Sequence, residues 1–307
     1  MKILITGGAG FIGSHVADAC VAAGHSVAIV DNLSMGKKEN LNPRATFYKL
    51  DIRDSALVEI FRKERFEAVF HLAAQMDVRK SVEDPIFDAS VNILGTLNIL
   101  EQCKASGVRK FIFASTGGAI YGEQEKFPAD ESHPLRPLSP YGITKLAVEK
   151  YLFYYREVFG LSSVALRFAN IYGPRQNPHG EAGVVAIFTS KMLAGERPTI
   201  NGDGKQSRDY TYVDDVVAAN MFALGYDRSG TFNVGTGVEA DVNALFAILN
   251  KATGGKCTSL HGPAKKGEQQ RSVLDYALIN KTFGWKPAVS LADGLVRTVE
   301  HFRKTRG

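Results

Sequence analysis

The first thirteen residues constrain the fold of this chain more than any other stretch. Lys2–Thr6 is apolar and β-branched, which predicts a buried strand, and the residues from Phe11 onward predict the first turns of a helix. The turn between them and the start of the helix carry glycines at positions Gly7, Gly8, Gly10 and Gly13. Unpaired N–H groups at a helix start attract an anion, and a turn without side chains lets it come close. The segment therefore predicts a phosphate-binding strand–turn–helix unit.

The spacing of these glycines indicates which phosphate compound binds. Gly8-x-Gly10-x-x-Gly13 fits the dinucleotide-binding fingerprint, and Gly7-x-x-Gly10-x-x-Gly13 fits a variant of it. Gly7 and Gly10 would form the tight turn and the approach to the pyrophosphate, and Gly13 would let the helix pack closely on the strand. Glycine-rich turns are common, so an ordinary turn between a strand and a helix is the alternative.

A carboxylate follows the second predicted strand, Ser26–Val30, at Asp31, eighteen residues after Gly13. At this place an acidic side chain binds the hydroxyls of the adenosine ribose, and it repels a 2′-phosphate. The position therefore favours NAD as the cofactor. Lys37 and Lys38 lie close enough in sequence to keep NADP open as the alternative, unless they belong to a solvated loop.

A second acidic position lies after the strand predicted at residues 46–50. Asp51 and Ile52 could line the pocket for the adenine ring. The alternative for Asp51 is a helix cap for the segment that begins near Ser55.

Length and charge bound the class of protein. With 307 residues and 45% hydrophobic content, the chain can form one large α/β domain and a smaller lobe. Its net charge of +5 includes no basic block, so we expect no nucleic-acid partner; a mildly positive chain suits an anionic small molecule instead.

Cysteine and histidine usage argues against a disulfide framework or a metal site. The odd set of three cysteines predicts free, buried thiols in a reducing cytoplasm, at Cys20, Cys103 and Cys257. The seven histidines show no metal-ligand spacing, so no metal is expected. No apolar run approaches 18 residues and a strand begins at residue 2, so we expect neither a membrane span nor a signal peptide.

The alternation of short apolar strands with amphipathic helices over residues 1–168 predicts a doubly wound parallel sheet of the Rossmann type. Its other strands are expected at 68–72, 110–114 and 163–167, with long helices near 86–106 and 141–159. Residues 169–307 contain shorter elements and more glycine and proline, and predict a smaller mixed α/β lobe that binds substrate. Ligands of such sheets bind at the carboxyl ends of the strands, so this lobe is expected to close over that crevice.

One face of the helix expected at 141–159 is predicted to lie in the core, through Val148, Leu152, Tyr155 and Phe159. Tyr151 and Tyr154 fall off that face. They indicate a contact between two copies of the chain in a homodimer, or else a partly buried surface pair.

Tyr141 and Lys145 carry the strongest chemical signal. They are four residues apart, so they project from one face of that helix. A phenol, whose pKa is about 10, becomes a usable base when a fixed ammonium group stabilises its phenolate. Ser115 and Thr116, at the end of an earlier strand, could hold the reacting oxygen. An ordinary surface pair is the alternative for a Tyr and a Lys at this spacing.

Seven segments together resemble the extended short-chain dehydrogenase/reductase family, and within it the UDP-glucose 4-epimerase (UDP-galactose 4-epimerase) subfamily. In chain order they are MKILITGGAGFIGSH at 1–15, DNLS at 31–34, HLAA at 71–74, NILGTL at 92–97, STGGAIYG at 115–122, SPYGITK at 139–145 and RFANIYGP at 167–174. The resemblance extends from residue 1 to about residue 300, in the same order and spacing.

This resemblance implies an isomerase that uses one tightly held NAD. Tyr141 would take the proton from the 4-hydroxyl of a UDP-hexose while C4 gives up hydride, and the transient 4-keto sugar would receive hydride on its other face. Lys145 would grip the nicotinamide ribose and lower the pKa of Tyr141. The residues that it implies for the cofactor are Gly7, Gly10, Phe11, Ile12, Gly13, Asp31, Asn32, Asp51, Ile52, Leu72, Ala73, Ala74, Asn92, Tyr141 and Lys145.

For the nucleotide sugar the resemblance implies Asn170, Val184, Arg208, Lys265, Glu268 and Ser272. Arg208 would clamp the diphosphate with its forked guanidinium group, the alternative being a surface ion pair. Asn170 would lie near the diphosphate, the alternative being a turn residue. A serine at position 272, where related epimerases carry a large side chain, predicts room for an N-acetyl group on the sugar.

The sequence departs from the family pattern in two places. Gly117 stands where many members have serine or threonine, so the hydroxyl must come from Thr116 or Ser115, and we favour Thr116. Lys265 and Glu268 stand in an element that normally holds the diphosphate through arginine, and lysine supplies charge without the guanidinium fork.

Three other functions stay open. UDP-glucuronate 4-epimerisation or decarboxylation would use the same Tyr141 and Lys145. A nucleotide-sugar 4,6-dehydratase also needs an acid and a base beside the hydroxyl residue, where this chain has Gly117 and Gly118. A regulatory NAD-binding protein without activity would not need the intact Tyr141 and Lys145.

Overall fold

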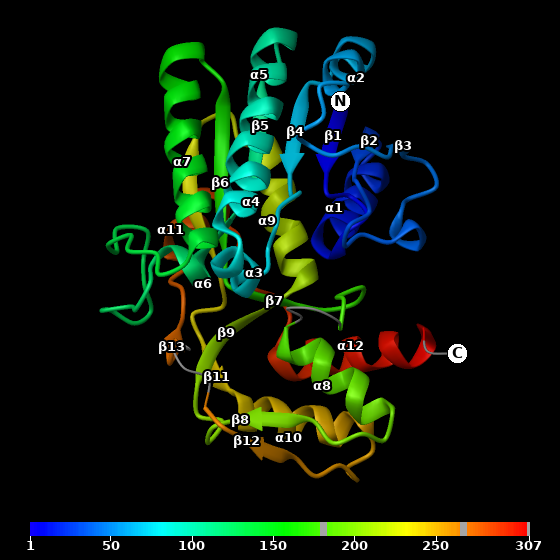
Figure 1. Ribbon diagram of the computed structural model, residues 1–307, viewed down its shortest axis with the longest axis vertical. Helices are drawn as coiled ribbons and strands as arrows, with labels where there is room; N and C mark the ends of the chain where they lie inside the picture. The colour runs from blue at the N-terminus through cyan, green and yellow to red at the C-terminus, as the bar shows by residue number, and fades with distance from the viewer. Residues whose placement is uncertain (179–182, 265–268, 306–307) are drawn as a thin grey trace.

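The structure is a computed structural model that describes residues 1–178, 183–264 and 269–305. Seven of the described strands form one parallel sheet in the order β10-β6-β5-β4-β1-β2-β3 (Figure 1). They are β1 (Lys2–Thr6), β2 (Ser26–Val30), β3 (Thr46–Tyr48), β4 (Ala68–His71), β5 (Lys110–Thr116), β6 (Ser162–Phe168) and β10 (Gly230–Val234). The expected doubly wound α/β sheet is confirmed.

Helices cover both faces of this sheet, which explains why its central strands carry buried apolar side chains on both faces. Side chains alternate between the faces: Ile3 and Ile5 belong to the core under α1 and α9, whereas Leu4 belongs to the core under α2, α5 and α7. The helices of these two layers are α1 (Phe11–Ala22), α9 (Val213–Gly225), α2 (Leu57–Glu64), α5 (Thr96–Ser106) and α7 (Pro140–Phe159).

The order in which the chain adds strands to the sheet reverses between β1 and β4. The chain runs outward from β1 to β2 and β3, then returns to place β4 on the other side of β1. At such a switch point the connections leave a crevice outside the carboxyl ends of the strands, and this is where doubly wound folds bind ligands.

The C-terminal lobe is built on smaller sheets. The strands β7 (Asn170–Tyr172), β9 (Ser207–Tyr212), β11 (Glu239–Asp241) and β13 (Arg271–Ser272) form one, and β8 (Thr199–Asn201) and β12 (Leu260–Gly262) form another. A separate apolar core joins them to α8 (Val184–Leu193), α10 (Val242–Thr253) and α12 (Leu291–Thr305), below the large sheet in Figure 1.

The chain crosses between the two parts more than once. After residue 168 it forms β7 and β9, then returns to the large sheet as α9 and β10, where β10 pairs with β6. The short α11 (Ala277–Phe283) also packs against β10. A boundary between residues 168 and 169 therefore stays a prediction about an interleaved pair of domains.

The single helix expected near 86–106 is three segments. They are α4 (Pro85–Ala89), a π-helical turn η2 (Ser90–Gly95) and α5, and the separate α3 (Val78–Glu83) precedes them. The widened turn contains Asn92, whose amide nitrogen donates to the carbonyl of Gln75 at 2.9 Å. Such turns often mark functional sites, and hydrophobic periodicity gives no sign of them.

Two expectations of burial were wrong. Phe159 is half-exposed because it is the last residue of α7, so its ring packs on Tyr154 and Tyr155 at the end of the helix and not in the core. Cys20 and Cys103 are buried as expected, but Cys257 is only partly buried because it lies in the irregular segment after α10; all three thiols are free.

Candidate active site

The glycine turn lies at the switch point of the sheet. Gly7 has a left-handed backbone, with φ of 73°, and a Cβ there would stand 2.7 Å from the backbone nitrogen of Ala73. A Cβ on Gly13 would stand 2.1 Å from the carbonyl oxygen of Gly7, so α1 packs directly on the turn. A Cβ on Gly10 would meet only that carbonyl oxygen within 4 Å, at 3.1 Å, which leaves this side of the turn open. The turn fits a dinucleotide pyrophosphate.

Asp31 is held over the glycine turn. Its carboxylate accepts hydrogen bonds from the backbone N–H groups of Ala9 at 3.0 Å and Leu33 at 2.8 Å. Among the hydrogen bonds and ion pairs of the described residues, no lysine or arginine that could bind a phosphate contacts the Asp31 carboxylate. The position therefore fits a ribose with free hydroxyls, as NAD has.

Asp51 and Asn32 lie next to each other at the ends of neighbouring strands. The Asn32 amide donates to Asp51 at 2.8 Å, and Arg53 donates to the same carboxylate at 2.8 Å. The Arg53 guanidinium lowers the pKa of Asp51 to about 2, against the opposing effect of burial. Asp51 does not cap α2, whose N-cap is Ala56. Ile52 is buried in the core, where its side chain packs against Gly95.

The segment after β4 lies beside the glycine turn. Polar contacts at the ends of β1 and β4 hold this segment in place. His71 bonds the hydroxyls of Thr6 at 2.8 Å and Thr96 at 2.9 Å. Burial, with the charge of Lys145, lowers the pKa of His71 to about 3, so the imidazole is neutral. Leu72 and Ala73 donate their N–H groups to Thr6, and Ala74 follows them.

Asn92 is buried and holds the segment after β4 through its side chain. Its oxygen accepts the N–H of Gln75 at 2.9 Å, and its nitrogen donates to the Gln75 carbonyl and to Asp88 at 3.0 Å. Asp88 also accepts from Thr144, the neighbour of Lys145. Asn92 therefore fixes the chain that follows 72–74 and links it to α7.

Tyr141 and Lys145 lie in the first turns of α7, at the end of β5. Ser139 caps the helix, and Gly142 allows close docking on α6 (Gly117–Ile120), because a Cβ on Gly142 would stand 2.7 Å from the Ala119 oxygen. The Lys145 ammonium donates to the Ala114 carbonyl at 2.8 Å and lies 5.7 Å from the centre of the Tyr141 ring.

The charge of Lys145 survives its burial. Burial lowers the pKa of Lys145 to about 8, while the carboxylates of Asp88 and Glu149 oppose the shift. The ammonium group is therefore the main form at pH 7, close enough to Tyr141 to favour its phenolate.

The two candidate hydroxyls differ in what they bind. Ser115 is buried and donates to Glu149 at 2.6 Å. Thr116 is half-buried and caps α6, where its oxygen accepts the N–H of Ala119 at 3.2 Å. Accepting that bond leaves the O–H of Thr116 available to donate, whereas the O–H of Ser115 is used in the bond to Glu149.

A buried polar network below this site was missed in the sequence. Glu149 forms a two-point ion pair with Arg167, with bonds of 3.0 and 2.7 Å, and Arg167 continues to the hydroxyl of Tyr121. Tyr121 donates to Asn233 on β10. One signal was present, since Glu149 follows Lys145 at helical spacing.

On the other side of the crevice, β9 and β13 bring Arg208 and Ser272 into register. The Arg208 guanidinium donates to the carbonyl oxygens of Ser207 at 2.8 Å and Gln269 at 2.7 Å, and no ion pair of Arg208 with an acid is found among the described residues. Asn170 is exposed at the start of β7, and its oxygen would lie 3.8 Å from a Cβ on Gly118, the second residue after Thr116.

The first turns of two helices supply the remaining predicted residues. Val184 begins α8 and is half-buried, and Phe11 and Ile12 begin α1. Lys265 and Glu268 lie outside the described residues.

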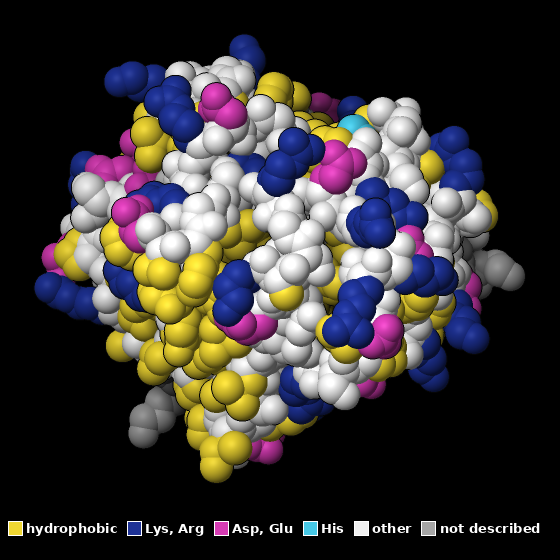
Figure 2. Space-filling view, turned by 90° about the horizontal axis from the view of Figure 1, so that it is seen from above, with side chains coloured by type: hydrophobic (Ala, Val, Ile, Leu, Met, Phe, Trp, Pro, Cys, Tyr) yellow, Lys and Arg dark blue, Asp and Glu magenta, His cyan; other side chains and the backbone are white. Residues whose placement is uncertain are grey.

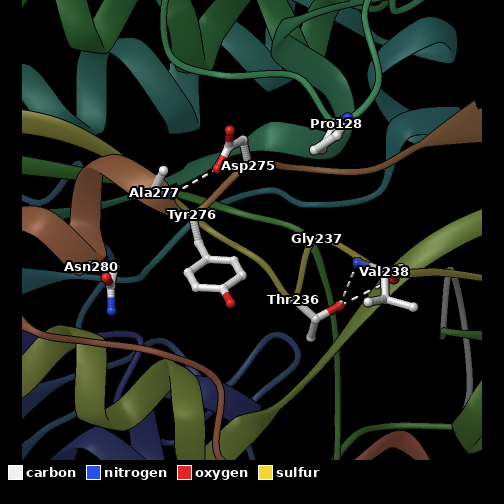
Figure 3. A pocket seen from close by; sticks show the side chains of 8 residues that line it. All are labelled: Pro128, Thr236, Gly237, Val238, Asp275, Tyr276, Ala277 and Asn280. Atoms are coloured by element: carbon white, nitrogen blue, oxygen red, sulfur yellow. Dashed lines mark hydrogen bonds between the residues drawn. The ribbon is translucent and has the colours of Figure 1, made fainter.

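The open pocket of about 520 Å³ in Figure 3 is not part of this constellation. It is lined by the turn after β10 and by the segment before α11, including Thr236, Gly237, Asp275 and Tyr276. Within the ranges that the structure describes, no cluster of three His, Cys, Asp or Glu side chains could hold a metal ion. Over the same ranges, no helix is long and apolar enough to cross a membrane.

Comparison with known proteins agrees with this geometry. The family model described as "NAD dependent epimerase/dehydratase family" matches residues 3–235. The structure of UDP-glucose 4-epimerase with UDP-glucose from Thermotoga maritima is 52% identical, covers 100% of both chains and superposes with a TM-score of 0.98. For the Thermus thermophilus UDP-glucose 4-epimerase complex with NAD, the identity is 46%, the coverage 99% of both chains and the TM-score 0.93.

A third solved structure is the UDP-N-acetylglucosamine 4-epimerase from Methanobrevibacter ruminantium in complex with UDP-N-acetylmuramic acid. It is 37% identical, with a TM-score of 0.94, over 99% of this chain and 98% of that one. The match of the family model to most of the chain, together with full-length likeness to three solved epimerases, leads to one conclusion. The chain belongs to the NAD dependent epimerase/dehydratase family.

Proposed function

We propose that this protein is an isomerase that interconverts UDP-glucose and UDP-galactose by epimerisation at C4, with NAD and through a transient 4-keto sugar. The observation that carries the proposal is the docking of α7 on the end of β5, which gathers Tyr141, Lys145 and Thr116 at the same edge of the sheet as the glycine turn, with β4 between them. The full-length likeness to a UDP-glucose 4-epimerase solved with UDP-glucose supports the choice of substrate.

The chain's own residues do the proton chemistry. When bound, NAD supplies the hydride acceptor and donor for C4 of the sugar. The Tyr141 phenolate takes the proton of the 4-hydroxyl, and its phenol returns that proton after the 4-keto sugar has turned over. The nearby Lys145 ammonium stabilises the phenolate, and the Thr116 hydroxyl holds the reacting oxygen. Arg208 would leave its carbonyl partners to bind the diphosphate.

The direct test needs no added cofactor. Purified protein is given UDP-galactose, the formation of UDP-glucose is followed, and a second sample is denatured to identify the nucleotide that it releases. Turnover with release of NAD is the expected result. Turnover that requires added NADP, or release of NADP, would contradict the assignment based on Asp31, and water loss to a 4-keto-6-deoxy sugar would identify a dehydratase.

We expect Thr116→Ala to lower kcat about 10²-fold, because it removes a donor from the reacting oxygen. Thr116→Ser keeps the hydroxyl and should retain most of the activity. Ser115→Ala is the neighbouring control: its hydroxyl donates to Glu149, so its loss should affect stability more than kcat. Initial rates at equal bound NAD decide the matter. An equal or larger loss of kcat in Ser115→Ala would reverse the assignment.

Ser272 is proposed to admit N-acetylated sugars. It is 3% exposed and lies in register with Arg208, so a larger side chain there would take space beside the bound nucleotide sugar. We expect the protein to interconvert UDP-GlcNAc and UDP-GalNAc as well, and Ser272→Tyr to lose that activity selectively. The measurement is kcat/KM for both sugar pairs. Inactivity of the unmodified protein on the acetylated pair would refute the idea, and so would an unchanged preference in the variant.

The functional unit is proposed to be a homodimer. Helix α7 exposes an apolar stripe at the spacing of a helix–helix seam, and α7 packs beside α4 and η2, which expose further apolar side chains. Figure 2 shows hydrophobic side chains gathered on one side of the molecule. We call this surface the helical patch; it comprises Ile86, Leu94, Ile143, Tyr151, Tyr154 and Val158. We also propose that the enzyme lies in the cytoplasm, because the free thiols of this chain suit a reducing compartment.

Tyr154→Glu should convert the dimer to a monomer, because it places a charge in the middle of the helical patch. Val296→Glu, at an exposed apolar residue of α12, is the matched control and should leave the dimer intact. Molar mass by light scattering after size exclusion reads the outcome. If Tyr154→Glu keeps the mass of the unmodified protein, this surface is not the interface.

A further inference from the structure

Leu274 makes the contact that brings the C-terminal lobe against the site of Thr116. Its side chain is fully buried and lies directly on Gly117, the residue after Thr116: a Cβ on Gly117 would stand 2.4 Å from one Leu274 methyl carbon and 2.8 Å from the other. Leu274 shares a small apolar cluster with Ile120 and Tyr121, at the end of α6. The glycine at 117 is thus matched to the leucine at 274.

The backbone around Leu274 is fixed by hydrogen bonds to three separate segments. Its own N–H donates to Asp209 at 3.3 Å. The N–H of Val273 donates to the side chain of Gln124 at 3.0 Å, and Ala129 exchanges backbone bonds with Val273 and Asp275 at 2.9 and 2.8 Å. The strand β13, which carries Ser272, ends immediately before this anchored stretch.

Asp209 ties that stretch to the strand of Arg208. The carboxylate is 1% exposed and also accepts the N–H groups of Thr236 at 2.9 Å and Gly237 at 3.1 Å. Asp209 follows Arg208 on β9. The bond from Leu274 to Asp209 therefore connects Leu274 to the side of the crevice that would bind the nucleotide, as well as to the side that would bind the sugar.

The outer side of the same stretch borders open space. Asp275 and Tyr276, together with Thr236 and Gly237 from the turn after β10, line the pocket of about 520 Å³ in Figure 3. The distance between this stretch and α6 is therefore determined by the contact on its inner side, where Leu274 packs on Gly117.

We propose that Leu274 is a positioning residue whose contact with Gly117 sets the separation between Ser272 and the Thr116 hydroxyl. The inference rests on the proposed function, in which Thr116 holds the reacting oxygen and Ser272 lines the sugar. Leu274 itself touches neither substrate nor cofactor. It acts through the distance between two walls of the crevice, to which a reaction between closely placed atoms is sensitive.

The experiment is a mutant cycle read by kcat and KM with UDP-galactose. Leu274→Ala leaves a gap over Gly117, and Gly117→Ala drives a methyl group into Leu274, so each variant should lower kcat by about tenfold or more. KM should change little, because neither substitution removes the backbone N–H of residue 274 that donates to Asp209, the neighbour of Arg208 on β9. The double variant replaces the missing leucine atoms by the new methyl group, and its kcat should exceed that of Gly117→Ala by about tenfold.

Controls separate positioning from loss of folding. Leu249→Ala makes the same deletion in the core of α10, away from the crevice, and should leave kcat per folded protein unchanged. Should Leu274→Ala fail to fold, Leu274→Met combined with Gly117→Ala serves in its place, because methionine keeps the volume and can bend away. Folded fraction and bound NAD are measured for each variant.

Wild-type kcat in Leu274→Ala, or losses that simply multiply in the double variant, would overturn the positioning role while leaving the proposed function intact. Absence of any turnover by the unmodified protein would instead overturn the proposed function, and the positioning role with it.

Discussion

Tyr141→Phe should lower kcat for the interconversion of UDP-galactose and UDP-glucose by about 10³-fold. The change removes one oxygen atom and keeps the ring, so packing at the start of α7 is preserved. Without the phenol, water must take the proton of the sugar 4-hydroxyl. The Lys145 ammonium, which lies 5.7 Å from the ring centre, then has no phenolate to stabilise.

Binding should survive this substitution. The glycine turn, Asp31 and Lys145 remain, so the variant should still release NAD when denatured and should bind UDP with unchanged affinity. Tyr151→Phe makes the identical chemical change on the same helix, at a partly exposed position of the helical patch, and should leave kcat unaltered. Turnover by Tyr141→Phe at the rate of the unmodified protein would remove Tyr141 as the base.

Local signals in the sequence predicted much of the fold and of the candidate site. Lys2–Thr6 and the glycines that follow it were predictable because a buried strand and a glycine-rich turn each leave a local pattern. The same holds for Tyr141 and Lys145, since the spacing of a helix face is local. The structure places these groups at the carboxyl ends of β1 and β5, the two strands that flank β4 in the parallel sheet, at the edge where a doubly wound sheet leaves its crevice.

What the sequence did not reveal depends on contacts between distant segments. Ser115 and Thr116 are adjacent hydroxyls, and only the position of Glu149, 34 residues further on, shows that Ser115 is engaged. The π-helical turn at Asn92 is accompanied by a bond from Asn92 to Gln75 in another segment, and hydrophobic periodicity indicates neither of them. The return of β10 to the large sheet is likewise a matter of pairing with β6.

The ion pair of Glu149 with Arg167 is the most consequential of these distant contacts. Both side chains are less than 10% exposed, and the pair joins α7 to β5 and β6 directly beneath Lys145. Removing one member leaves the other charge buried without a partner, which destabilises a fold far more than removing a surface pair. The carboxylate also raises the pKa of Lys145, whose burial acts in the opposite and larger sense.

Glu149→Gln should therefore lower the free energy of unfolding by about 3–5 kcal/mol. Glu59→Gln, which breaks the exposed pair with Arg62 on α2, is the matched control and should change it by about 0.5 kcal/mol or less. Urea titrations of both variants and the unmodified protein supply the comparison. Similar midpoints for the two variants would show that the buried pair contributes no more than a surface one.

Glu149→Gln should also change the pH dependence of the activity. With Glu149 neutral, the pKa of Lys145 falls below its value of about 8, so the ammonium is lost at lower pH as the solution is made alkaline. The alkaline limb of the kcat profile should move to lower pH in whatever fraction stays folded, whereas Glu59→Gln should leave it in place. A loss of stability with an unmoved alkaline limb would confine Glu149 to a structural role, because a group that merely ties α7 to the sheet has no reason to shift the titration of Lys145.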